Sequence, residues 1–97
     1  MMMGVIARVR IHGDRQADWE RIFAERRERV LATEPGTLAY DLLRSQDDPL
    51  VYMAVERFTD RDAYLAHRAG SVGHEAMLAC MDGDPDITYL DPVPGCW

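Results

Sequence analysis

The sequence has 97 residues, a length typical of one domain. Its content of 47% hydrophobic and 29% charged residues is that of a folded protein and excludes a disordered chain. The net charge is −6 and the 11 arginines are interleaved with acidic residues, so nucleic acid is not an expected partner. The apolar start is too short for a signal peptide or a membrane span, which predicts a cytoplasmic protein without a membrane partner. We predict a single domain over residues 1–97, with a core at about 3–91 and a C-terminal arm at 92–97.

The first half of the chain changes from a strand pattern to a helix pattern. Residues 5–11 alternate between apolar and mostly polar side chains, which predicts a strand with one buried face. Residues 16–33 predict a helix capped by Asp14 or Asp18, because apolar side chains recur at helical spacing at Trp19, Ile22, Phe23, Val30 and Leu31. Pro35 and the glycine after it end this helix.

The middle of the chain predicts a β-hairpin followed by a second helix. Residues 38–44 and 51–58 are rich in Leu, Val, Tyr and Phe, and the turn-forming cluster at 45–49 separates them. The Thr59 hydroxyl is placed to accept from a backbone amide near Asp62, so we expect a helix from there to about residue 68.

The last third predicts a short helix, a strand and an arm. A break between Gly70 and Gly73 precedes a helical face that consists of His74, Met77, Leu78 and Met81. Residues 87–90 predict the last strand, and two prolines keep the tail extended. The order βαββαβ, with its second helix broken, predicts an α+β ferredoxin-like fold with an antiparallel four-stranded sheet. Its second sheet face would be half apolar, so we expect a homodimer that packs sheet against sheet.

The cysteines and histidines do not predict a metal site. Cys80 and Cys96 form no CxxC pair, and the three histidines and scattered carboxylates lack tight metal-ligand spacing. We therefore expect a buried thiol at Cys80 and an exposed tail thiol at Cys96.

Four segments, in order, resemble the antibiotic biosynthesis monooxygenase family: Glu34-Pro35-Gly36-Thr37-Leu38-Ala39-Tyr40, Asp47-Asp48-Pro49, Glu56-Arg57-Phe58 and Asp62-Ala63-Tyr64-Leu65-Ala66-His67. They cover about the middle half of the chain. The resemblance implies a dimeric α+β barrel, with a pocket in each subunit between sheet and helices. It also implies oxygenation of aromatic hydroquinones or anthrones without metal or flavin, with molecular oxygen as co-substrate. Relatives degrade haem, isomerise small phosphorylated sugars or have no known activity, so membership does not fix the reaction.

Three residues are candidates for catalysis. His67 follows the family pattern and, as a neutral imidazole, would take a proton from a phenol or hydroquinone; the alternative is a core histidine that anchors its helix. Glu56 would orient His67, or form a structural ion pair with an arginine such as Arg8 or Arg57. His74 shares the face of the short helix that we expect to point into the pocket.

Six residues are candidates for substrate binding: Trp19, Tyr40, Tyr52, Tyr64, Arg26 and Met77. The aromatic residues would line a pocket for a planar ligand, although such residues more often simply pack in the core. Arg26 or Arg27 would reach an acidic group of the ligand, or would extend along the helix edge into solvent. Met77 stands where haem-degrading relatives carry a histidine ligand, which disfavours haem degradation unless His74 replaces that ligand.

We therefore expect a cofactor-independent monooxygenase that oxidises an aromatic hydroquinone, an anthrone or a related small molecule. Two alternatives stay open: a non-catalytic dimer that binds a small metabolite, and an isomerase or haem-handling relative of the same fold.

Overall fold

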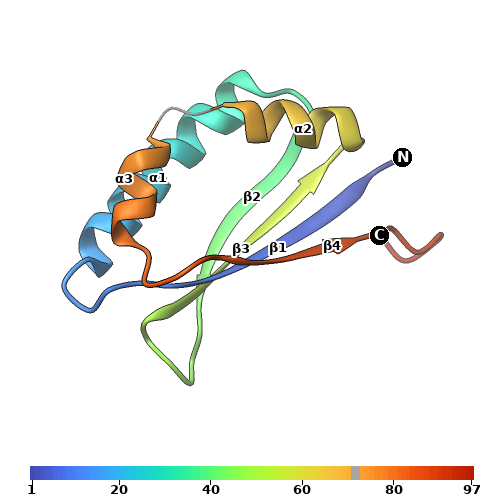
Figure 1. Ribbon diagram of the computed structural model, residues 1–97. Coiled ribbons are helices and arrows are strands. Elements are labelled where there is room, and N and C mark those ends of the chain that lie inside the picture. The colour runs from blue at the N-terminus through green and yellow to red at the C-terminus, as the bar shows by residue number, and fades with distance from the viewer. Residues whose placement is uncertain (71–72) are drawn as a thin grey trace.

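The computed structural model describes residues 1–70 and 73–97, which form an antiparallel four-stranded sheet with helices on one face (Figure 1). The strands are β1 (Met3–Arg10), β2 (Thr37–Arg44), β3 (Val51–Phe58) and β4 (Asp86–Leu90), in the order β2-β3-β1-β4. The helices are α1 (Gln16–Thr33), α2 (Arg61–Ala69) and α3 (His74–Cys80). This arrangement confirms the predicted α+β ferredoxin-like fold. Among the described residues, no helix is both long and apolar enough to cross a membrane.

The starts of α1 and α2 differ from the sequence predictions. Neither Asp14 nor Asp18 caps α1, which begins without a side-chain cap. The cap of α2 is Asp60, whose carboxylate accepts a 2.8 Å hydrogen bond from the backbone N–H of Ala63. The predicted capping residue, Thr59, was therefore wrong; the residue that follows it, Asp60, is the cap. The extended backbone at Asp60 places its side chain over the first turn, where its carboxylate satisfies an otherwise unpaired N–H group.

The second helical region consists of two separate helices, as its predicted break requires. Helix α2 ends at Ala69, with Gly70 as its C-cap, and α3 follows Gly73, which has a positive φ of 81°. The predicted break itself covers residues 71–72, which lie outside the described residues.

The buried face of α3 is narrower than predicted. Met77 and Cys80 face the core, whereas Leu78 keeps 48% of its surface exposed, so its assignment to the inward face was wrong. Residues three apart lie on one side of a short helix, and Leu78 lies about 100° farther round than Met77. Cys80 is buried and Cys96 is exposed, which confirms the prediction for both thiols.

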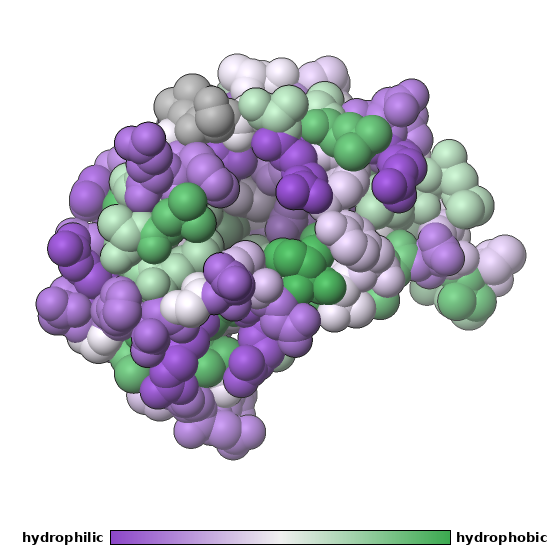
Figure 2. Space-filling view, viewed as in Figure 1, coloured by the Kyte–Doolittle hydropathy of each residue, from purple (hydrophilic) through white to green (hydrophobic). Residues whose placement is uncertain are grey.

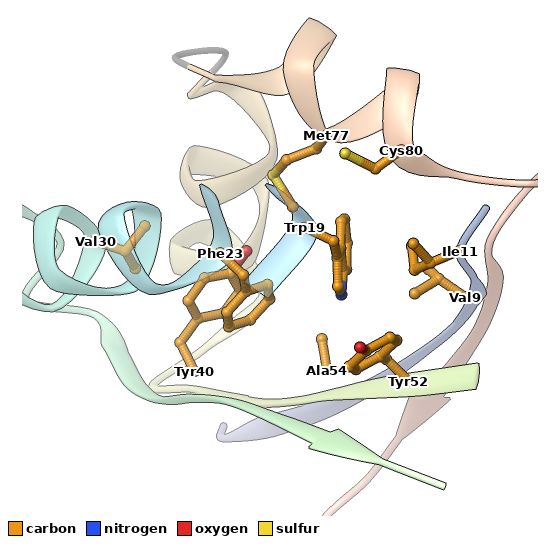
Figure 3. Packing of buried hydrophobic residues seen from close by; sticks show 10 residues of the cluster. All are labelled: Val9, Ile11, Trp19, Phe23, Val30, Tyr40, Tyr52, Ala54, Met77 and Cys80. Atoms are coloured by element: carbon orange, nitrogen blue, oxygen red, sulfur yellow. The ribbon is translucent and has the colours of Figure 1, made fainter. Parts of the chain in front are cut away.

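The larger part of the core lies between α1, α3 and the sheet (Figure 3). The indole of Trp19 lies between Met77 and Cys80 of α3 on one side and Ala54 and Tyr52 of β3 on the other. A smaller cluster beneath α2 contains Met3, Val5, Phe58 and Tyr64. Burial of each large apolar side chain contributes about 2–3 kcal/mol. The two clusters therefore hold all three helices against one sheet face.

Gly36 lets α2 approach the turn between α1 and β2. A Cβ atom on Gly36 would lie only 2.5 Å from the Cβ of Ala63 and 3.2 Å from the Thr59 hydroxyl. The Gly36 carbonyl also accepts a 2.9 Å hydrogen bond from the Thr59 N–H group. A residue without a side chain is required for this approach, which brings the residues of α2 close to the C-terminal end of α1.

Candidate functional site

A cavity of about 400 Å³ lies between the helices and the sheet. Figure 2 shows the molecule hollowed at this place, with α2 above the hollow, α3 to its left and β4 below it. Side chains from every helix and strand border the cavity: Val5, Ala7, Val9, Trp19, Phe23, Arg26, Tyr40, Ala54, Glu56, Tyr64, His67, Arg68, His74, Met77, Met81, Pro85, Ile87 and Tyr89. The walls are largely apolar and aromatic, with a few convergent polar groups, as is typical of a small-molecule site.

His67 stands on the inward face of α2 and is 6% exposed. Its Nδ1 atom lies 2.8 Å from Oε1 of Glu34, and its Nε2 atom lies 3.5 Å from Oε1 of Glu56. The ring packs edge-on against Tyr40, with a centroid distance of 5.0 Å. The carboxylate of Glu34 thus holds the imidazole at Nδ1, while Nε2 faces the carboxylate of Glu56 in the cavity wall.

Glu56 belongs to the cavity and not to an ion pair with Arg8 or Arg57. It is 8% exposed and points toward the helices, while Arg57, the next residue along the strand, points to the opposite face of the sheet. Arg8 is exposed as well. The Glu56 carboxyl therefore lies beside His67, and the charges that act on it are those of the buried Arg26 guanidinium and of Glu34.

Burial shifts the pKa values of Glu56 and His67 in opposite directions. Burial raises the pKa of Glu56 to about 7, an effect that the positive charge of Arg26 opposes and the negative charge of Glu34 reinforces. Burial lowers the pKa of His67, while Glu34 acts in the opposite direction and Arg26 adds to the decrease. Near pH 7 the imidazole is therefore neutral and Glu56 is partly protonated. Such a pair can exchange a proton with a bound hydroxyl group.

Arg26 points into the protein and borders the cavity, so of the two alternatives for this residue the extension along the helix edge into solvent was wrong. It is 9% exposed; its Nε donates to the Tyr40 hydroxyl at 3.0 Å and its Nη2 to the Gly70 carbonyl at 3.5 Å. These acceptors come from β2 and from the end of α2, and they offset the cost of burying a charge. Arg27 does lie at the helix edge, where it forms an exposed ion pair with Asp41 at 3.1 Å.

Tyrosine hydroxyls meet on the β4 side of the cavity. The hydroxyl of Tyr64 lies 2.9 Å from that of Tyr89, and Arg68 donates to the Tyr64 hydroxyl at 3.4 Å. Sequence reasoning selected Tyr64 but missed Tyr89 and Arg68. Strand alternation offers a signal for Tyr89, because it places Ile87 and Tyr89 on one face of the last strand; in the structure both border the cavity, and Tyr89 pairs with the buried Val5.

The remaining predicted residues on the helices lie at different depths. Trp19 and Met77 are buried in the cavity wall, at 2% and 9% exposure. The Nε1 group of Trp19 is buried and has no hydrogen-bond partner among the described residues; Figure 3 shows it on the edge of the ring away from Met77. His74 borders the cavity from the first turn of α3 but is exposed, so it contacts solvent as well as the cavity.

Tyr52 is the predicted residue that does not reach the cavity. Its ring packs in the core with a centroid 6.2 Å from that of Trp19. Its hydroxyl donates to Glu20 at 2.6 Å and accepts from Gln16 at 3.3 Å, both on α1. Tyr52 lies on the helix-facing side of β3, as alternation requires, but Gln16 and Glu20 hold its hydroxyl outside the cavity lining. Of the two alternatives for Tyr52, core packing therefore agrees with its contacts, and ligand binding does not.

Two further observations limit the choice of site. In residues 1–70 and 73–97, no group of three or more His, Cys, Asp or Glu side chains is placed to hold a metal ion. A second hollow of about 450 Å³ is lined by residues 1–3, 60–62 and 89–91, none of which is a histidine. The cavity around His67 therefore combines room for a small molecule with a buried acid–base pair.

Comparison with known proteins assigns the chain to a family. The model of the family described as antibiotic biosynthesis monooxygenase matches residues 2–81. No curated protein matches the chain.

Solved structures share this fold over nearly the whole chain. A candidate antibiotic biosynthesis monooxygenase from Caulobacter crescentus is 36% identical, with 95% of this chain and 90% of that chain covered and a TM-score of 0.88. Rv0793 from Mycobacterium tuberculosis is 22% identical, with both chains covered completely and a TM-score of 0.86. An N63A mutant of SnoaB, a cofactor-independent oxygenase from Streptomyces nogalater, is 24% identical, with 98% and 96% covered and a TM-score of 0.81.

Proposed function

Because the chain belongs to the antibiotic biosynthesis monooxygenase family, we propose that it is a cofactor-independent monooxygenase that oxidises an aromatic hydroquinone, an anthrone or a related small molecule. The observation that carries this proposal is the buried pair of His67 and Glu56, 3.5 Å apart in the wall of an aromatic cavity. SnoaB, whose fold this chain shares, is a cofactor-independent oxygenase, so this fold is able to house such chemistry.

The first step is removal of a proton from the bound aromatic molecule. A hydroxyl group, or a C–H group activated by the rings, lies within hydrogen-bonding reach of Nε2 of His67. The neutral imidazole accepts the proton, and the ionised form of Glu56 stabilises the imidazolium that results. Burial of both side chains, at 6% and 8% exposure, strengthens this electrostatic interaction.

The second step is reaction of the substrate anion with dioxygen. The anion transfers one electron to dioxygen, and the resulting substrate radical and superoxide combine into a peroxide anion. His67 returns its proton to the peroxide, which loses water together with the second hydrogen of the reacting carbon. The net change converts a CH2 group and O2 into a C=O group and H2O, so no other reductant is needed. The protein contributes the base, a shielded pocket and alignment of the ring.

Oxygen uptake tests the proposal. The assay follows dissolved oxygen with a panel of hydroquinones and anthrones, using wild-type protein, His67→Ala, His74→Ala and the control His12→Ala, whose exposed side chain is not part of the cavity lining. We expect uptake with at least one substrate and a loss of about 100-fold or more in His67→Ala, with His12→Ala unchanged. No uptake across the panel, or full activity of both cavity variants, would contradict the proposal. Quenching of Trp19 fluorescence without uptake would instead indicate a non-catalytic binding protein.

The assembly that we propose is a homodimer formed through the open face of the sheet. Leu43 and Met53 pair in register on β2 and β3, point away from the helices and are 60% and 39% exposed. Apolar side chains on a sheet face favour burial against a second copy. Size-exclusion chromatography with light scattering is expected to give twice the 11.1 kDa chain mass, and Met53→Glu is expected to reduce it. A monomer at micromolar concentration would contradict the dimer.

A further inference from the structure

We propose that Glu34 is a positioning residue that fixes the proton of neutral His67 on Nδ1, so that Nε2 becomes the basic nitrogen. This inference rests on the proposed function for its consequence in catalysis, but the tautomer itself is independent of any reaction. Glu34 is not among the residues that line the cavity, so it acts through His67 and does not touch the substrate.

The end of α1 holds Glu34 in place. Its backbone N–H group donates to the Val30 carbonyl at 2.9 Å, and Pro35 follows it directly. Its Oε1 atom accepts from the Thr37 hydroxyl at 2.9 Å and lies 2.8 Å from Nδ1 of His67. The Thr37 contact restricts the rotamer of the carboxylate, and the contact with Nδ1 is well within hydrogen-bonding distance.

The chemistry of the two groups determines where the proton lies. An ionised carboxylate only accepts hydrogen bonds, so a short contact with Nδ1 requires Nδ1 to carry the proton. Nε2 then keeps its lone pair, and this atom faces Glu56 at 3.5 Å, which is too long for a strong hydrogen bond. Nε2 is therefore available to a substrate proton.

The charges around His67 support a neutral ring with this orientation. Glu34 and Glu56 flank it from the end of α1 and from β3, while Arg26 of α1 and the Tyr40 hydroxyl of β2 pack on the same side of the sheet. The positive charge of Arg26 and burial both disfavour the imidazolium, and Glu34 favours it. The side chain of Glu34 is 25% exposed and that of His67 is 8% exposed, so solvent reaches the pair from the side of Glu34.

Nitrogen-15 NMR of the imidazole measures the tautomer directly in the wild-type protein. His67→Gln identifies the His67 signals among those of the three histidines. We expect a protonated Nδ1 and an unprotonated Nε2 above the pKa of the ring. A wild-type ring protonated on Nε2 would overturn the proposal, and this outcome does not depend on any variant.

Two variants separate the position of the proton from the charge of Glu34. Glu34→Gln keeps an acceptor for Nδ1, so the tautomer is expected to stay, while loss of the negative charge moves the titration of His67 to lower pH. Glu34→Ala removes the acceptor, and the ring is expected to shift toward protonation on Nε2. Glu28→Gln, on the exposed side of α1, is the control and should change neither signal. An unchanged tautomer in folded Glu34→Ala would refute the role.

Kinetics connects this result to the reaction. If the oxygenase proposal holds, Glu34→Ala lowers kcat about 10-fold or more with little change in KM, and Glu34→Gln recovers most of the rate. Unchanged kinetics beside a changed tautomer would overturn the catalytic consequence. Absence of oxygenase activity in every form would remove the proposed function, while the NMR result would still decide the placement of the proton.

Discussion

Replacement of Glu56 by glutamine should make the protein less sensitive to pH over a defined range. Burial raises the pKa of the Glu56 carboxyl from 4.5 to about 7, so the folded state binds this proton more tightly than the unfolded chain does. Protonated Glu56 therefore makes its full contribution to the free energy of unfolding below about pH 4.5. This contribution is lost as pH rises through about 7, because the buried carboxyl then ionises. Each pKa unit corresponds to about 1.4 kcal/mol, so the loss amounts to about 3 kcal/mol.

Urea denaturation of wild-type protein and Glu56→Gln, at equal protein concentration and between pH 4.5 and 8, measures this effect through tryptophan fluorescence. The free energy of unfolding of the wild type, relative to the variant, is expected to fall by about 3 kcal/mol across the range. Because the comparison is a difference, the titration of remote groups cancels. Glu28→Gln, which removes an exposed carboxylate, should differ from wild type by a nearly constant amount. A constant difference between wild type and Glu56→Gln would refute the reasoning.

Two further predictions concern the packing of the helices. Gly36→Ala should lower the free energy of unfolding by about 1–3 kcal/mol, since its new methyl group would lie 2.5 Å from the Cβ of Ala63. The control is Gly13→Ala, whose methyl group would meet nothing within 4 Å. Equal melting temperatures of the two variants would contradict the steric argument. A thiol reagent should label Cys96 rapidly and Cys80 only on unfolding, because burial covers the Cys80 thiol and raises its pKa. If mass spectrometry finds both cysteines labelled in the native protein, the packing of α3 is contradicted.

The sequence was sufficient to predict the elements because hydrophobic periodicity determines them. The predicted helix at 16–33 and strand at 51–58 coincide with α1 and β3, and the other strands differ by one or two residues at their ends. The helix starts were harder, because several residues near each start are able to cap it. The choice of Asp60 over Thr59 depends on backbone angles that the sequence pattern does not contain.

The site was only partly predictable, because its key contacts join residues far apart in the chain. Periodicity placed His67 and Glu56 on inward faces, and the structure brings them to 3.5 Å. For Arg26 the pattern left both a ligand contact and the helix edge open, since its acceptors on β2 and at the end of α2 are invisible in the pattern of α1. Glu34 carried the signals of a helix end and of a family segment, but neither points to His67, because its role depends on the approach of α2 that Gly36 permits. Partners across 33 residues of sequence require the tertiary structure.

The most direct test of the central claim is a crystal structure with a quinone or phenol analogue that cannot be oxidised. The claim is that the cavity between sheet and helices presents its base to an aromatic ligand. We expect an oxygen atom of the analogue at about 3 Å from Nε2 of His67 or from the Glu56 carboxyl, with its rings against the aromatic wall. An analogue bound in the hollow formed by residues 1–3, 60–62 and 89–91, with the cavity around His67 empty, would contradict the account.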